Sequence, residues 1–130
     1  MSNAEALAAY RSVNTAFNVD DADPHRLIQM LLDGALERIH TAMGCISRGD
    51  VAGKGEQIGK AISIVEGLRI SLNPEGGEIS RNLGDLYDYI ARRLLEANLA
   101  DDPSRLNESA SLLREIKTAW DVIGATAEES

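Results

Sequence analysis

The residues of this sequence best suited to chemistry are its two histidines and the carboxylates near them. The segment "ERIH" places Glu37 and His40 three residues apart, the spacing that ferritin-like di-iron bundles use twice, together with two further inward glutamates. Only one copy is present here, and His25 has Ala22 three residues before it. The sequence therefore predicts neither a metal site nor a cofactor.

Histidine phosphotransfer is a second chemistry to weigh. His40 is followed by Gly44, and in phosphotransfer bundles a glycine at this spacing leaves space beside the phosphorylated imidazole. A basic residue would be expected to hold the phosphoryl group, but Met43 occupies the i+3 position. We favour a solvated histidine and keep phosphotransfer as an alternative. The sequence has no phosphate loop and no nucleophile paired with a base, so it predicts that the protein is not an enzyme.

Four segments with helical periodicity must position these residues. The expected helices cover about residues 24–47, 51–72, 77–100 and 103–124. Asp23 and Asp102 each precede a proline, which is the pattern of an N-cap followed by proline at the first helical position. Short connections make neighbouring helices antiparallel. The sequence therefore predicts an all-α fold, an antiparallel up-down four-helix bundle over residues 23–125.

The two ends of the chain are expected to lie outside this bundle. Residues 1–22 carry Leu7, Tyr10 and Phe17 at roughly helical spacing, which favours a short extra N-terminal helix that is marginal on its own. It is either a frayed terminus or a mobile flap that covers a groove when no partner is present. Residues 126–130 are expected to form a disordered tail.

Charge and composition exclude several classes of protein. Thirteen Lys and Arg against twenty-one Asp and Glu give a net charge of −8, which disfavours nucleic acid and anionic membrane surfaces. Cys45 is the only cysteine, so no internal disulfide can form. The start of the chain lacks the pattern of a signal peptide, and no apolar run is long enough to insert into a membrane. We expect a cytosolic protein.

Two of the expected helices carry more apolar surface than one contact needs. In the segment 86–98, one stripe runs through Leu86, Ile90, Leu94 and Ala97, and a second stripe runs beside it through Tyr87, Ala91, Leu95 and Asn98. The apolar residues of the first long helix spread over about half the helical wheel. Wide stripes either contact two neighbouring helices or expose a groove into which an amphipathic helix can be laid.

Several sequence blocks resemble one family over nearly the whole chain. The blocks are "AYRSV" with Tyr10, "DPHRLIQMLLDGA" (23–35), "GDVAGKGEQIGKAISIVEGL" (49–68), "GGEISRNLGDLYDYIARRLLEANLADD" (76–102) and "KTAWDVI" (117–123). Their order and spacing are similar to those of the flagellar secretion chaperone FliS family. The resemblance implies a chaperone that binds the C-terminal segment of flagellin, prevents premature polymerisation and assists delivery to the export gate of flagellar type III secretion.

The resemblance and the wheel geometry together suggest site residues. We expect the client groove to consist of Ile28, Leu32, Leu36, Ile39, Met43, Tyr87, Ala91 and Leu95. Leu7 and Tyr10 match the family's N-terminal segment, which is associated with capping the bundle and with the export gate. Leu32 stands where an aromatic residue is frequent in the family. A homodimer in the absence of client, and a helical adaptor for a different client, are left open.

Overall fold

A computed structural model describes residues 23–129 of the chain, with side chains to residue 122. Its helices are α2 (Pro24–Arg48), α3 (Val51–Ile70), the short 3-10 turn η1 (Pro74–Gly76), α4 (Gly77–Ala100) and α5 (Pro103–Glu129). The predicted all-α fold is confirmed, and within this range no helix is both long and apolar enough to cross a membrane.

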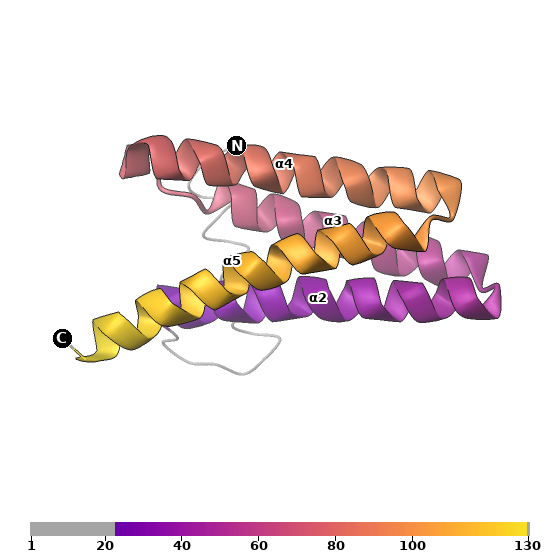
Figure 1. Cartoon of the computed structure of the whole chain (residues 1–130), viewed down its shortest axis with the longest axis horizontal. Coiled ribbons are helices and arrows are strands. Elements are labelled where there is room, and N and C mark those ends of the chain that lie inside the picture. The colour runs from indigo at the N-terminus through magenta and orange to yellow at the C-terminus, as the bar shows by residue number, and fades with distance from the viewer. Residues whose placement is uncertain (1–22, 130) are drawn as a thin grey trace.

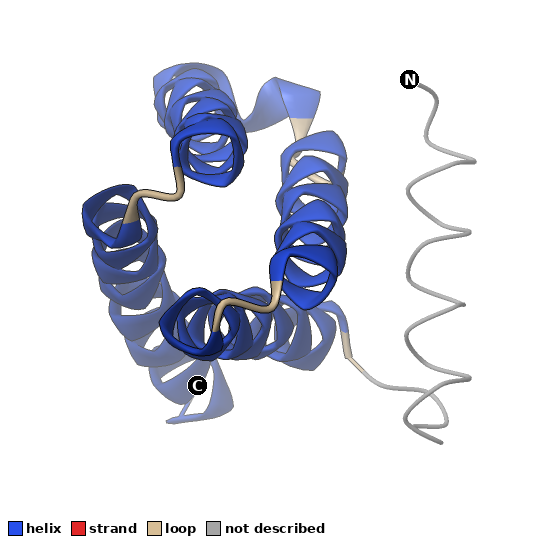
Figure 2. Cartoon of the chain, turned by 90° about the vertical axis from the view of Figure 1, so that its right-hand side faces the viewer, coloured by secondary structure: helices blue, strands red, loops and turns tan. Residues whose placement is uncertain are grey.

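The four α-helices form a closed ring in which each contacts two neighbours. Contacts join α2 to α3, α3 to α4, α4 to α5, and α5 back to α2. Seen end-on, the helices stand at the corners of a square (Figure 2), and consecutive helices run in opposite directions (Figure 1). Helix α5 crosses the others obliquely, so its last turns extend beyond the start of α2 (Figure 1).

Local signals set most of the helix ends. Asp23 caps α2 by accepting a hydrogen bond from the Arg26 backbone N–H at 2.9 Å, as expected for an aspartate before proline. Asp50 caps α3 in the same way. Gly49 ends α2 with a φ of 71°, a left-handed conformation that glycine adopts without steric cost. These caps leave only a tight turn between α2 and α3.

The boundaries differ from expectation at two places. Helix α3 ends at Ile70 and η1 follows it, because Asn73 and Pro74 start a new turn in which the Asn73 side chain accepts a hydrogen bond from the Glu75 N–H. Helix α5 runs to Glu129 instead of ending near residue 124. After Gly124 the sequence continues with alanines and glutamates, which favour helix.

The core lies along the axis of the ring and is almost entirely aliphatic. Its largest fully buried side chains include Leu32, Ile39, Ile58, Leu68, Ile90, Leu94, Leu106 and Leu113. Alanines on all four helices fill the narrower positions between them. Every helix contributes to one continuous cluster, so the four helices depend on each other for stability.

Substitution of Leu94 tests this core. Leu94 is 0% exposed, whereas Leu99 on the same helix is 79% exposed. We expect Leu94→Ala to lower the free energy of unfolding by about 2–5 kcal/mol, because the substitution leaves a cavity, and Leu99→Ala to change it by less than about 0.5 kcal/mol. Urea denaturation followed by circular dichroism measures both, and equal losses would contradict the packing described here.

Candidate functional site

The residues considered for metal or phosphate chemistry lie on an exposed face of α2. Glu37 and His40 are both exposed, and no group of three or more His, Cys, Asp or Glu in the described part of the chain could hold a metal ion. The sequence analysis looked for a basic residue near His40 and Gly44 and did not consider Arg48. Its guanidinium lies over Gly44, since a Cβ added there would meet Arg48 Nη1 at 3.1 Å. It also donates to Cys45 Sγ at 3.7 Å.

The eight expected groove residues do not form one surface. Leu32 and Ile39 are 0% exposed and Tyr87 is 2% exposed, and all three belong to the core cluster. Ile28, Leu36, Met43 and Ala91 are half-buried and pack against that cluster, and Leu95 is 51% exposed. A helical wheel could not separate the buried from the exposed residues of this set, because a helix in a closed ring buries two adjacent stripes, one toward each neighbour.

Part of the expected second stripe does line a surface groove. The α3–α4 groove, a shallow depression of about 320 Å³, is lined by Ile62, Glu66, Asp88, Ala91, Arg92 and Leu95. Arg69 pairs with Glu66 at 2.7 Å and with Asp88 at 3.2 Å. These carboxylates raise the pKa of the Arg69 guanidinium, mainly through the hydrogen bond that Arg69 donates to Glu66. The groove thus has an apolar floor and charged borders, and the exposed Leu99 follows Leu95 one turn later.

A larger hollow lies where α2 begins and α3 ends. The bundle-end cavity measures about 390 Å³ and receives residues from all four helices, including Ile28, Leu68, Leu83, Ile116 and Trp120. Ser71, Asn73 and Ser80 supply polar groups at the corner between α3 and α4. Among the residues that the structure describes, no Asp, Glu, Lys or Arg lines it.

One wall of this cavity joins the start of α2 to the last part of α5. The rings of His25 and Trp120 stack with centroids 4.7 Å apart and planes 9° from parallel. Trp120 Nε1 donates to the His25 backbone oxygen at 2.9 Å. His25 Nε2 is buried without a hydrogen-bond partner in the described structure.

Polar contacts beside this wall also link α5 to α2. Gln29 donates to Asp121 at 2.7 Å, and Lys117 donates to Asp121 at 2.9 Å and pairs with Asp33 at 3.6 Å. The Lys117 and Gln29 hydrogen bonds lower the pKa of the Asp121 carboxyl. The Asp121 hydrogen bond in turn raises the pKa of the Lys117 ammonium.

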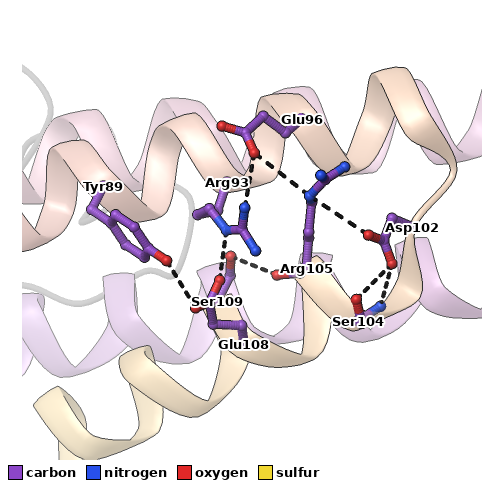
Figure 3. Close-up of polar contacts among 8 residues, drawn as sticks. All are labelled: Tyr89, Arg93, Glu96, Asp102, Ser104, Arg105, Glu108 and Ser109. Atoms are coloured by element: carbon purple, nitrogen blue, oxygen red, sulfur yellow. Dashed lines mark hydrogen bonds and ion pairs between the residues drawn. The ribbon is translucent and has the colours of Figure 1, made fainter.

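A polar network joins α4 to α5 near the turn that connects these two helices (Figure 3). Glu108 accepts hydrogen bonds from Arg93 at 2.6 Å and from the Tyr89 hydroxyl at 2.8 Å. Arg93 also pairs with Glu96 at 2.9 Å, and Glu96 reaches Arg105 at 3.5 Å. The Arg93 bond, then the Tyr89 bond, lowers the pKa of the Glu108 carboxyl, and the Glu108 bond raises the pKa of the Tyr89 phenol.

Nearby, Lys54 fastens α3 to the end of α4. The Lys54 side chain is 7% exposed, and its ammonium donates to the Asn98 carbonyl oxygen at 2.9 Å and to the Asp101 carboxylate. The carbonyl belongs to the last turn of α4, where helix carbonyls lack partners within the helix. The turn end of the bundle, where the α2–α3 and α4–α5 turns lie, is therefore closed by charged and hydrogen-bonded groups. The other end contains an apolar cavity.

These features define a helical bundle whose candidate sites are apolar depressions for binding. The family model described as "Flagellar protein FliS" matches residues 6–127. The chain belongs to this FliS family, which confirms the resemblance found in the sequence.

Three relatives illustrate the match. "Flagellar secretion chaperone FliSB" of Pseudomonas aeruginosa is 48% identical over 92% of this chain and 95% of its own length. "Flagellar secretion chaperone FliS" of Salmonella typhimurium is 44% identical over 98% of this chain and 96% of its own. The protein of the same name from Vibrio cholerae is 40% identical over 91% and 88%. Similarity thus extends through all four helices.

Three of the expected groove residues, Ile28, Leu32 and Tyr87, line the bundle-end cavity, but the sequence did not indicate the cavity itself, although a signal for it was present. In an up-down bundle the start of the first helix lies beside the end of the fourth, so His25 and Trp120 could have been paired by topology. Ile62 and Arg92 of the α3–α4 groove were also missed, because they are single positions without a motif. Leu7 and Tyr10 lie outside the described residues.

The pH dependence of unfolding tests the Glu108 network. Because the pKa of Glu108 is lowered in the folded state, its stabilising effect is present above the unfolded pKa, about 4.3, and is lost as the pH falls through the folded pKa. We expect Glu108→Gln to reduce the loss of stability on acidification, measured by urea denaturation from neutral to acidic pH.

The matched control for this measurement is Glu115→Gln, which removes the same charge from an exposed position of α5. It lies outside the network of Figure 3. If both variants follow the same pH profile, the network does not contribute the acid-sensitive stability assigned to it.

Proposed function

We propose that this protein is a cytosolic export chaperone. It binds the C-terminal segment of flagellin, prevents premature polymerisation and assists delivery to the flagellar type III export gate. The observation that carries the proposal is the family match across residues 6–127, with relatives named flagellar secretion chaperones at up to 48% identity. The protein acts by binding and not by catalysis.

The surface supports binding of an extended or helical chain segment. An unfolded client loses conformational entropy when it is ordered, so contact area must be distributed along its length. The α3–α4 groove offers an apolar floor between charged borders, which suits an amphipathic helix. Each medium-sized client side chain that becomes buried contributes about 1.5–3 kcal/mol before the ordering cost.

The structure suggests how the eight expected groove residues divide their roles. We propose that Ile28, Leu36, Met43, Ala91 and Leu95 contact the client, and we add Ile62 to them. Ile39 lies beneath this surface in the core, and Leu32 and Tyr87, which also belong to the core cluster, line the bundle-end cavity. The N-terminal residues Leu7 and Tyr10 are proposed to serve the export gate. In the absence of client, the exposed Leu95 and Leu99 offer a surface for a homodimer.

Calorimetric titration with a peptide of the flagellin C-terminal region tests this function. We expect 1:1 binding with a negative change in heat capacity, because apolar surface is buried. Leu95→Asp should weaken binding about tenfold or more, since it places a charge in the α3–α4 groove. Leu32→Asp is unsuitable, because a charge at a 0% exposed position would unfold the bundle.

Ser111→Asp is the control, since it adds the same charge to an exposed position in the middle of α5. Wild-type affinity is expected for this variant. If a folded wild-type protein does not bind the peptide, flagellin is not the client. Binding of another amphipathic segment under the same conditions would indicate a helical adaptor for a different client.

Removal of residues 1–18 tests whether the N-terminal segment competes with the client. If the segment covers client-binding surface, the truncated protein should bind the flagellin peptide more tightly, because the competing contact is gone. The same calorimetric titration measures the change. Unchanged or weaker binding would show that the segment does not compete.

A further inference from the structure

The bundle-end cavity stands out because it lacks charge. The chain contains thirteen basic and twenty-one acidic residues, yet no Asp, Glu, Lys or Arg of the described part of the chain lines this cavity. Its walls are mainly Ile, Leu and aromatic side chains from all four helices. Such a lining is complementary to an uncharged apolar group and rejects a charged one, which would lose its hydration without gaining a partner.

The size of the cavity limits the occupant further. An engineered apolar cavity of about 150 Å³ accepts one benzene ring, and the present cavity measures about 390 Å³. It is therefore large enough for a leucine, isoleucine or phenylalanine side chain with space for part of the chain that carries it.

The rim of the cavity is apolar and faces solvent. Ile79, in the first turn of α4, lines the cavity and is 79% exposed. A chain that enters the cavity would cover this side chain and remove its apolar surface from water. Polar groups for the entering backbone are also present, because Ser71, Asn73 and Ser80 line the same space.

The cavity and the α3–α4 groove lie along one helix. Leu83 lines the cavity and Ala91 lines the groove, and these residues are separated by about 12 Å along α4 at 1.5 Å per residue. An extended segment of about four residues covers this axial separation. Two linked contacts strengthen each other, because occupation of the first raises the effective concentration of the second.

We propose that the bundle-end cavity is a specificity pocket that receives one large uncharged side chain, Leu, Ile or Phe, from the client that occupies the α3–α4 groove. This inference depends on the proposed chaperone function. The pocket selects the client by an anchor residue, and the groove supplies the remaining apolar contact. Trp120 and His25 form the wall that connects α2 to α5.

Trp120 allows occupancy of the pocket to be measured directly. It is the only tryptophan of the chain and lines the cavity, so its fluorescence reports this site and not the α3–α4 groove. On titration with a tryptophan-free flagellin C-terminal peptide, we expect Trp120 emission to shift to shorter wavelength, because the entering side chain displaces water. Calorimetry of the same mixture measures total binding independently.

A matched pair of variants separates the pocket from the rest of the surface. Ile79→Asp places a carboxylate at the rim, and Val51→Asp places one at the far end of the bundle. Both positions are exposed, 79% and 70%, and both lie in the first turn of a helix, where a carboxylate is favourable. Both variants should therefore fold. We expect Ile79→Asp to weaken peptide binding about 10- to 100-fold and to abolish the emission shift, and Val51→Asp to change neither.

The outcomes distinguish this inference from the proposed function. Calorimetric binding without a Trp120 shift, and with equal affinities for the two variants, would overturn the pocket and leave the chaperone function standing. Absence of any heat of binding to the folded protein would overturn both. If removal of residues 1–18 shifts Trp120 emission without peptide, and peptide then causes no further change, the pocket belongs to the N-terminal segment and the proposal is wrong.

Discussion

The structure depends on the burial of two adjacent apolar stripes on each helix. In the closed ring every helix must meet two neighbours, so the apolar arc has to be wider than a single contact requires. Leu32, Ile39 and Tyr87 are in the core for this reason. Surface available to a partner is what remains at the edges of these arcs, where Ala91 and Leu95 lie beside Ile62. The candidate sites are therefore borders of the core and not separate additions to it.

The two ends of the ring are closed by different kinds of interaction. At the turn end, Lys54, Arg93 and Arg105 join carboxylates and a helix carbonyl into directional contacts. Individual exposed ion pairs contribute little, but a network that fixes several side chains contributes more. At the other end, Trp120 and a few polar contacts hold α5 against an apolar hollow. This division places directional polar contacts at one end and a ligand-sized space at the other.

Much of the fold could be predicted from the sequence, and much of the site could not. The Asp–Pro pairs and the helical period indicate four antiparallel helices, because caps and periodicity are local properties. The sequence did not indicate that Tyr87, placed in the client groove, is almost fully buried at the wall of the bundle-end cavity, since its burial depends on which neighbour its stripe faces. Helical wheels contain no information on that choice. The cavity around Trp120 arises from residues of four helices, and only the assembled ring brings them together.

The contact between His25 and Trp120 has a consequence for the order of folding. These residues are 95 positions apart in the chain, whereas the α2–α3, α3–α4 and α4–α5 contacts are between helices joined by short turns. Closing a long loop costs more entropy than closing a short one, and local contacts form more readily. We expect the three hairpins to assemble before α5 docks on the start of α2. We expect the end of the bundle that forms last to be the end that opens at the lowest free energy.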